Sequence, residues 1–231
     1  MRYLVNSNQY EVIEAALEMT KEIRVNSSIT NEEINLLPLG AFEGEMVVIS
    51  DPEHLDEALE KINSFHTIGF DTETKPVFVR GQHNKVAILQ IALPETVFII
   101  RLMATGLTPK LISFLQNEKI EKAGVAIRDD LKALQLLKKF KPGGFIELAQ
   151  LSKDTGLEVE SVKKLTALLL GFRISKSAQT SNWEAPQLNE KQISYAATDA
   201  WVCLKIYEIL KSGKITVIPK PLPPEEPVEQ Q

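Results

Sequence analysis

Hydrophobic and polar positions follow two periods along the chain, and the change between them separates predicted strands from predicted helices. Five short apolar runs predict strands, at residues 46–50, 67–73, 86–93, 97–100 and 120–125. Apolar residues three and four positions apart predict helices, at residues 52–63, 109–115, after 125 to 137, 147–155, 161–170 and 190–211. Three strands in succession, followed by alternation with helices, predict an α/β fold with a mixed sheet.

Capping signals support several of these helices. Asp51 and Thr108 are each followed by proline, which favours a helix that begins at the proline. Asn189 precedes the last helix with Gln192 three positions later, a capping-box pattern. Gly171 is a typical residue for the end of the helix at 161–170. These helix boundaries therefore rest on local backbone chemistry as well as on the apolar period.

Three regions differ in composition and predict a division of the chain. Residues 1–45 carry a helical pattern, with Val12, Ala16 and Ile23 on one face, and predict an N-terminal helical extension. Residues 46–215 contain the alternating strands and helices. Residues 216–231 are rich in proline and glutamate and have too little apolar mass to bury, which predicts a disordered tail.

Composition narrows the classes of function. The single cysteine, Cys203, excludes a disulfide framework and a cysteine-based zinc site. The start of the chain lacks the apolar run of a signal peptide, and no apolar stretch is long enough to span a membrane, so we expect a cytosolic protein without a membrane partner. No glycine-rich dinucleotide or P-loop motif occurs. The net charge of −5 argues against a large basic nucleic-acid surface, but not against a small acidic cleft that holds metal ions.

An acidic pair, Asp71 and Glu73, lies at the end of the predicted strand at 67–73. Alternate side chains of a strand share a face, so these two carboxylates point one way while Phe70 and Thr72 point the other. Two neighbouring carboxylates repel each other, and a hard divalent cation such as Mg²⁺ or Mn²⁺ relieves that repulsion. The alternative is an edge strand whose acidic face is solvated.

Two later segments contain aspartates that could have either a structural or a functional role. Asp129 and Asp130 lie at a junction between a strand and a helix, where aspartate also serves as an ordinary cap. Tyr195 and Asp199 are four residues apart, so they share one face of the last helix. An aspartate among small and apolar residues is costly to bury without a partner, which a metal ion or a tyrosine hydroxyl could provide.

Taken together, the pattern Asp71-x-Glu73, then Asp130, then Tyr195-x3-Asp199 resembles the DEDD superfamily of 3′–5′ exonucleases, in the branch marked by tyrosine. The stretches around Gly69–Glu73, Lys85–Ile91 and Tyr195–Ala200 resemble the Werner-type exonuclease domain most, and ribonuclease D more distantly. The resemblance covers residues 46–212. It implies a ribonuclease H-like fold, with a mixed sheet of five or six strands flanked by helices.

The resemblance also implies a two-metal site with Mg²⁺ or Mn²⁺ as cofactor. By this similarity, Asp71 bridges both ions, and Glu73 and Asp199 complete the site of the ion that activates water. Asp130 holds the second ion, through water. Tyr195 orients the attacking water, since the ordinary pKa of tyrosine, about 10, disfavours proton acceptance at neutral pH.

Further residues are candidates for contact with the substrate. The set comprises Phe70, Thr72, Arg80, Lys85, Lys176 and Trp183. The alternative for the basic residues is ordinary solvated loop charge. For Trp183, stacking on a base and packing of the linker onto the last helix are equally compatible with the sequence.

The predicted function is a metal-dependent 3′–5′ exonuclease that releases nucleoside 5′-monophosphates, with DNA favoured over RNA. One alternative is a module that keeps the fold and binds nucleic acid without cleaving it. A second is a ribonuclease D-like enzyme that trims RNA. A protein partner bound through residues 1–45 is a further alternative, although no motif in that segment supports it.

Overall fold

The structure is a computed structural model that describes residues 22–77 and 84–219. Its main sheet has six strands in the order β2-β5-β4-β3-β6-β7. The strands are β2 (Glu45–Ile49), β3 (Thr67–Thr74), β4 (Val86–Ala92), β5 (Thr96–Arg101), β6 (Glu121–Gly124) and β7 (Phe145–Glu147). β3, β4 and β5 form an antiparallel meander, while β2, β6 and β7 join their neighbours in parallel. The predicted mixed α/β fold is confirmed.

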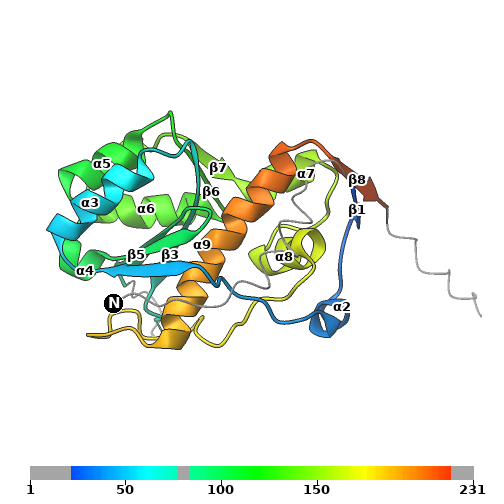
Figure 1. The fold of residues 1–231 in the computed structure, drawn as a ribbon, viewed down its shortest axis with the longest axis horizontal. Coiled ribbons are helices and arrows are strands. Elements are labelled where there is room, and N and C mark those ends of the chain that lie inside the picture. The colour runs from blue at the N-terminus through cyan, green and yellow to red at the C-terminus, as the bar shows by residue number, and fades with distance from the viewer. Residues whose placement is uncertain (1–21, 78–83, 220–231) are drawn as a thin grey trace, which may run out of the picture.

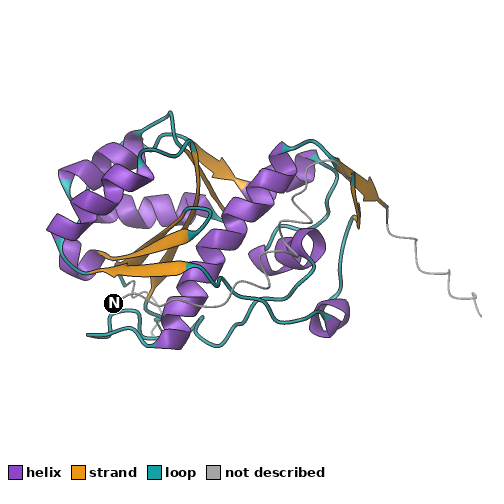
Figure 2. Ribbon diagram, in the orientation of Figure 1, coloured by secondary structure: helices purple, strands orange, loops and turns teal. Residues whose placement is uncertain are grey.

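One face of the sheet is covered by α3 (Pro52–Ile62), α5 (Pro109–Gln116) and α6 (Ile127–Leu137) (Figures 1 and 2). Asp51 and Thr108 cap the first two of these helices by accepting hydrogen bonds from backbone N–H groups three residues later. Apolar residues of these helices pack on strand residues that include Phe70 and Leu89. The caps and the apolar faces therefore build this layer as the sequence predicts.

The opposite face is covered by the 22-residue helix α9 (Glu190–Lys211), which runs across the sheet in contact with five of its strands (Figure 1). The helices α7 (Leu148–Asp154) and α8 (Val162–Leu170) pack on α9. Apolar residues of these three helices and of the strands form a second core on this face. The Asn189–Gln192 capping box is present at the start of α9. This face is the one that carries Asp71 and Glu73.

The sequence pattern does not predict two short elements of the main body. The helix α4 (Leu102–Thr105) has four residues, and β7 has three. Segments of this length span too little of either period to be recognised. β7 adds the sixth strand of the sheet, where the sequence pattern predicts five.

The two ends of the described chain meet away from the main sheet. β1 (Ile23–Asn26) pairs in parallel with β8 (Ile215–Ile218), and α2 (Asn31–Leu36) follows β1 with a capping box at Thr30. Ile23, which the apolar period assigns to a helix, is therefore in a strand. Residues 216–218, which the composition assigns to a disordered tail, belong to β8. Residues 1–21 of the predicted N-terminal extension and residues 220–231 of the predicted tail lie outside the described residues.

In the part of the chain that the structure describes, no helix is both long enough and apolar enough to cross a membrane.

Candidate active site

The register of β3 sends its side chains to two different layers. Ile68 and Phe70 are buried in the core with α3, α5 and α6. Gly69 faces α9, because a Cβ atom built on it would lie 1.9 Å from the carbonyl oxygen of Ala200. Asp71 and Glu73, two and four residues later, share the face of Gly69. The strand therefore directs both carboxylates toward α9.

The missing side chain at Gly69 lets α9 approach the sheet closely. The helix backbone at Ala200 occupies the space that any other residue would fill. Asp199 precedes Ala200, so this close approach brings its carboxylate next to the end of β3. A glycine two residues before Asp71 thus sets the distance between the strand and helix parts of the site.

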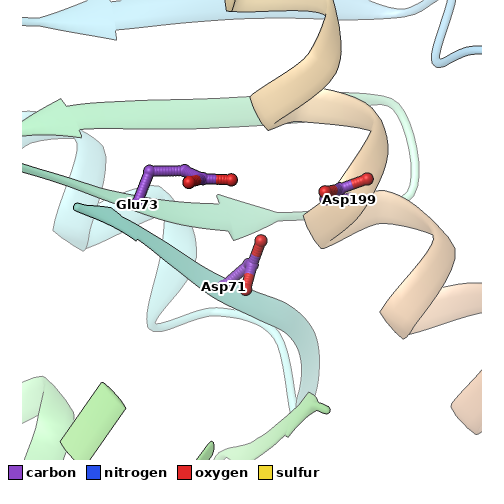
Figure 3. Close-up of side chains that lie close together, drawn as sticks. All are labelled: Asp71, Glu73 and Asp199. Carbon is purple, nitrogen blue, oxygen red and sulfur yellow. The ribbon is translucent and has the colours of Figure 1, made fainter. Parts of the chain in front are cut away.

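Three carboxylates meet at this point. Asp71, Glu73 and Asp199 each offer an oxygen atom that lies within 4.8 Å of the other two, and Figure 3 shows them directed into a shared space between β3 and α9. Asp199 is only 9% exposed, and its Oδ1 atom has no hydrogen-bond partner among the described residues. A cluster of this kind has an excess of negative charge and of acceptor oxygens.

This crowding changes the acidity of the three carboxyl groups. Burial, and then the charges of Asp199, Glu73 and Asp130, raise the pKa of Asp71 well above its ordinary value. Burial, with the charges of Asp199 and Asp130, raises the pKa of Glu73 to about 8. Burial raises the pKa of Asp199 to about 7, although the Tyr195 hydroxyl opposes this effect. Without a cation the group therefore retains protons near neutral pH.

Asp130 reaches the site from the other side of β3. It lies in the first turn of α6, and its Oδ1 atom accepts a 2.5 Å hydrogen bond from the Thr72 hydroxyl. It is outside the group of three that lie within 4.8 Å, but its charge acts on both Asp71 and Glu73. Burial raises the pKa of Asp130 to about 6. Thr72 therefore holds Asp130 against β3.

Glu147 shapes the turn that presents Asp130. Ala126, at the start of α6, has a φ of 59°, in the left-handed region that non-glycine residues rarely adopt. The Glu147 carboxylate accepts hydrogen bonds from the backbone N–H groups of Ala126, at 3.1 Å, and Ile127, at 3.0 Å. Sequence reasoning does not identify this residue, because it contacts the turn across 20 residues of chain.

Tyr195 lies one helical turn before Asp199 on α9. Burial, and then the charges of Asp199 and Glu73, raise the pKa of its hydroxyl above the ordinary value of 10, so the hydroxyl stays protonated at neutral pH. The Tyr195 ring lies 6.0 Å from the ring of Trp183, centroid to centroid. Both Tyr195 and Asp199 line a cavity of about 300 Å³, and its other walls are residues 39–41, Ile174, Ser175, Ser177 and the first turns of α9.

The residues that the sequence predicts as substrate contacts differ in their burial. Phe70 is 1% exposed and packs edge-on against Phe145 with ring centroids 5.1 Å apart, so its ring lies in the core, and a contact between Phe70 and the substrate stays a prediction. Trp183 is 1% exposed, so it packs the linker onto α9 and is not free to stack on a base. Lys85 and Lys176 are exposed. Arg80 lies outside the described residues.

The donor set fits hard divalent cations. All the candidate ligand atoms are carboxylate oxygens, the ligands that Mg²⁺ and Mn²⁺ prefer. The raised pKa values of Glu73 and Asp199 and the unpartnered Oδ1 atom of Asp199 are what a site would show when its charge lacks a counterion. Asp71, Glu73 and Asp199 could hold one cation directly, and Asp130 lies on the opposite side of β3, hydrogen-bonded to Thr72.

The sequence of this chain matches a known family and a curated protein. A family model described as 3′–5′ exonuclease matches residues 46–213. The bifunctional 3′–5′ exonuclease/ATP-dependent helicase WRN of Mus musculus is 32% identical over 186 residues, which are 75% of this chain and 13% of that protein. The chain thus spans a small part of the length of this curated relative.

Solved structures show the same arrangement of elements. The Nibbler EXO domain of Aedes aegypti has a TM-score of 0.63 and 25% sequence identity, covering 71% of this chain and 86% of that domain. Ribonuclease D of Escherichia coli has a TM-score of 0.66 and 23% identity, covering 73% of this chain and 45% of that one. The second likeness concerns the fold alone.

Proposed function

The chain belongs to the 3′–5′ exonuclease family, and from this premise we propose that it hydrolyses the terminal phosphodiester bond at the 3′ end of nucleic acid. The observation that carries the proposal is the meeting of three carboxylates from β3 and α9, with a fourth hydrogen-bonded to the same strand from α6. The proposed product is a nucleoside 5′-monophosphate.

The proposed cofactor is a pair of divalent cations, Mg²⁺ or Mn²⁺. When bound, such cations stabilise the charge on the attacking and leaving oxygens of an in-line displacement at phosphorus. Asp71, Glu73 and Asp199 would hold them, with Asp130 on the opposite side of β3. The Tyr195 hydroxyl, which stays protonated, orients the attacking water by hydrogen bonding and does not take its proton.

We propose DNA as the favoured substrate, because the chain resembles the Werner-type exonuclease domain and is 32% identical to the bifunctional 3′–5′ exonuclease/ATP-dependent helicase WRN of Mus musculus. Trimming of RNA is the alternative substrate proposal. The 2′-hydroxyl distinguishes the two nucleic acids.

Lys176 and Lys85 are our candidates for contacts with substrate phosphates. Lys176 lies between Ser175 and Ser177, which line the cavity beside Tyr195. Cytosolic location remains a prediction from the sequence.

Degradation of matched DNA and RNA oligonucleotides, labelled at the 5′ end, tests the proposal. We expect a ladder of products that requires Mg²⁺ or Mn²⁺ and disappears with EDTA and in Asp71→Asn. Asp129→Asn is the matched control, because Asp129 is exposed and pairs with Lys132 beside the site. Absence of a ladder with either substrate and either cation, or a ladder that persists in Asp71→Asn, would reject the proposal. Binding without cleavage would favour the non-catalytic module.

A further inference from the structure

One polar side chain lies in an otherwise apolar row beside the carboxylates. Gln90 on β4 is the register partner of Asp71 on β3, and on its other side it is the partner of Ile99 on β5. Residues directly opposite each other in an antiparallel pair point to the same face. Ile88 and Ala92, two positions away from Gln90 on either side, belong to the core with α9. Gln90 therefore points toward α9 beside Asp71.

The Gln90 amide is enclosed, and it has no hydrogen-bond partner in the part of the chain that the structure describes. The residue is 0% exposed, and among the described residues neither Nε2 nor Oε1 has a hydrogen-bond partner. Buried amides are almost always hydrogen-bonded, because losing water without replacement is costly. An apolar side chain of the same length would fill this place without that cost. Packing alone therefore does not explain a glutamine between Ile99 and Asp71.

Hydrogen-bond acceptors for the Gln90 amide lie next to it on β3. Cβ atoms of directly opposite residues lie about 4.5–5.5 Å apart, so an amide at the end of a two-carbon stem reaches the neighbouring carboxylate by rotation of its side chain. Asp71 belongs to the carboxylate group, whose member Asp199 has an Oδ1 atom that is itself unpartnered. Carboxylates that hold metal ions are commonly oriented by a hydrogen bond from a neighbouring donor.

We propose that Gln90 is a positioning residue for the cation site, whose side-chain amide donates a hydrogen bond to the Asp71 carboxylate when that carboxylate holds a divalent cation. The inference rests on the proposed function. Gln90 acts through Asp71 and does not touch the cation or the substrate. A donor at this point fixes the orientation of the Asp71 oxygens, since an unsupported carboxylate can rotate and loses affinity.

Gln90→Met tests the proposal, because methionine has a similar length and no strong hydrogen-bonding group. We expect the dissociation constant for Mn²⁺, measured by titration calorimetry, to rise by about 10–100-fold. We expect the melting temperature of the cation-free protein to stay the same or increase, because no existing hydrogen bond is removed. Ile99→Val is the matched control on the other side of Gln90, and it should lower the melting temperature while the Mn²⁺ affinity stays that of the native chain.

Unchanged Mn²⁺ affinity in Gln90→Met would overturn the proposal, and so would a large fall in its melting temperature, which would indicate a structural hydrogen bond. A second measurement uses the native chain, where the Gln90 side-chain NH₂ signals, assigned by their loss in the Met variant, should shift in NMR spectra on addition of Mg²⁺. Signals that stay in place contradict the inference. A native chain that binds cations and degrades nucleic acid while Gln90→Met binds equally well would refute the role of Gln90 alone. Failure of the native chain to bind any cation would refute the proposed function as well.

Discussion

Replacement of Asp199 by asparagine should stabilise the cation-free protein near pH 8, although it removes a proposed ligand. The substitution keeps the shape of the side chain and removes one negative charge from the group formed with Asp71 and Glu73. Burial raises the pKa of Asp199 from its ordinary 3.8 to about 7, so the ionised carboxylate is less stable in the folded chain than in the unfolded chain. Asparagine does not carry this cost.

The raised pKa also sets the magnitude and the pH range of the effect. At about 1.4 kcal/mol per pH unit, the difference between 3.8 and about 7 gives an upper limit of roughly 4 kcal/mol. Since Asp71 and Glu73 compete for the same protons, we expect about 1–4 kcal/mol, or roughly 3–12 °C in melting temperature for a chain of this size.

The sign of the pH dependence follows from proton binding. The folded chain holds its proton at Asp199 more tightly than the unfolded chain does, so stability falls as pH rises. The advantage of Asp199→Asn should therefore be absent below about pH 4, grow up to about pH 7 and stay constant above that value. Proton retention at Glu73, whose pKa is about 8, extends the loss of stability in the native chain beyond this range.

Thermal unfolding in EDTA over this pH range measures the effect in the native chain and in Asp199→Asn. Asp129→Asn is the control, because hydrogen bonding to Lys132 lowers the pKa of the exposed Asp129 and its removal should bring no gain at any pH. Mg²⁺ at about 100 times its dissociation constant should offset most or all of this advantage, since binding then adds about 2.7 kcal/mol to the stability of the native chain. A melting temperature of Asp199→Asn at or below that of the native chain near pH 8 would refute the reasoning.

Three further predictions concern the residues around the carboxylates. Tyr195→Phe should retain Mn²⁺ affinity and lower the single-turnover cleavage rate by roughly 10²-fold, because the attacking water loses its orienting hydroxyl; an unchanged rate would contradict that role. Glu147→Ala should lower the cleavage rate and Mn²⁺ affinity, because the turn at Ala126 loses the acceptor of two backbone N–H groups and Asp130 is then less well placed; equal affinity would count against it. Lys122→Met should lower stability by about 1–3 kcal/mol without changing Mn²⁺ affinity, because three backbone carbonyls, two of them buried, lose their donor, and chemical denaturation would measure the loss.

The sequence alone predicts those helices and strands that depend on residues close together in the chain. The proline-marked starts of α3 and α5 and the capping box of α9 appear where the sequence predicts them, because each depends on side chains within three residues of the helix start. The alternation on β3 likewise predicts that Asp71 and Phe70 face different layers, because it follows from strand geometry. Elements that depend on distant partners are less accessible. Ile23 follows a helical period, yet its strand forms by pairing with β8, nearly 200 residues later.

In the candidate site, too, some features can be predicted from the sequence and others depend on the packing of the folded chain. Residue type and spacing show hard oxygen ligands but leave each acidic cluster open between a structural and a cation-binding role, and the resemblance to the exonuclease family singles out the four carboxylates and Tyr195 as candidates. Only the folded chain decides that Gly69 admits α9 close enough for Asp199 to meet Asp71, and that Thr72 and Glu147 hold Asp130 and its turn. It also decides that Phe70 and Trp183 are buried, and that Gln90 lies beside Asp71 with no hydrogen-bond partner among the residues described. These facts are contacts across long stretches of chain, and a contact is a property of packing, which no local pattern of residues contains.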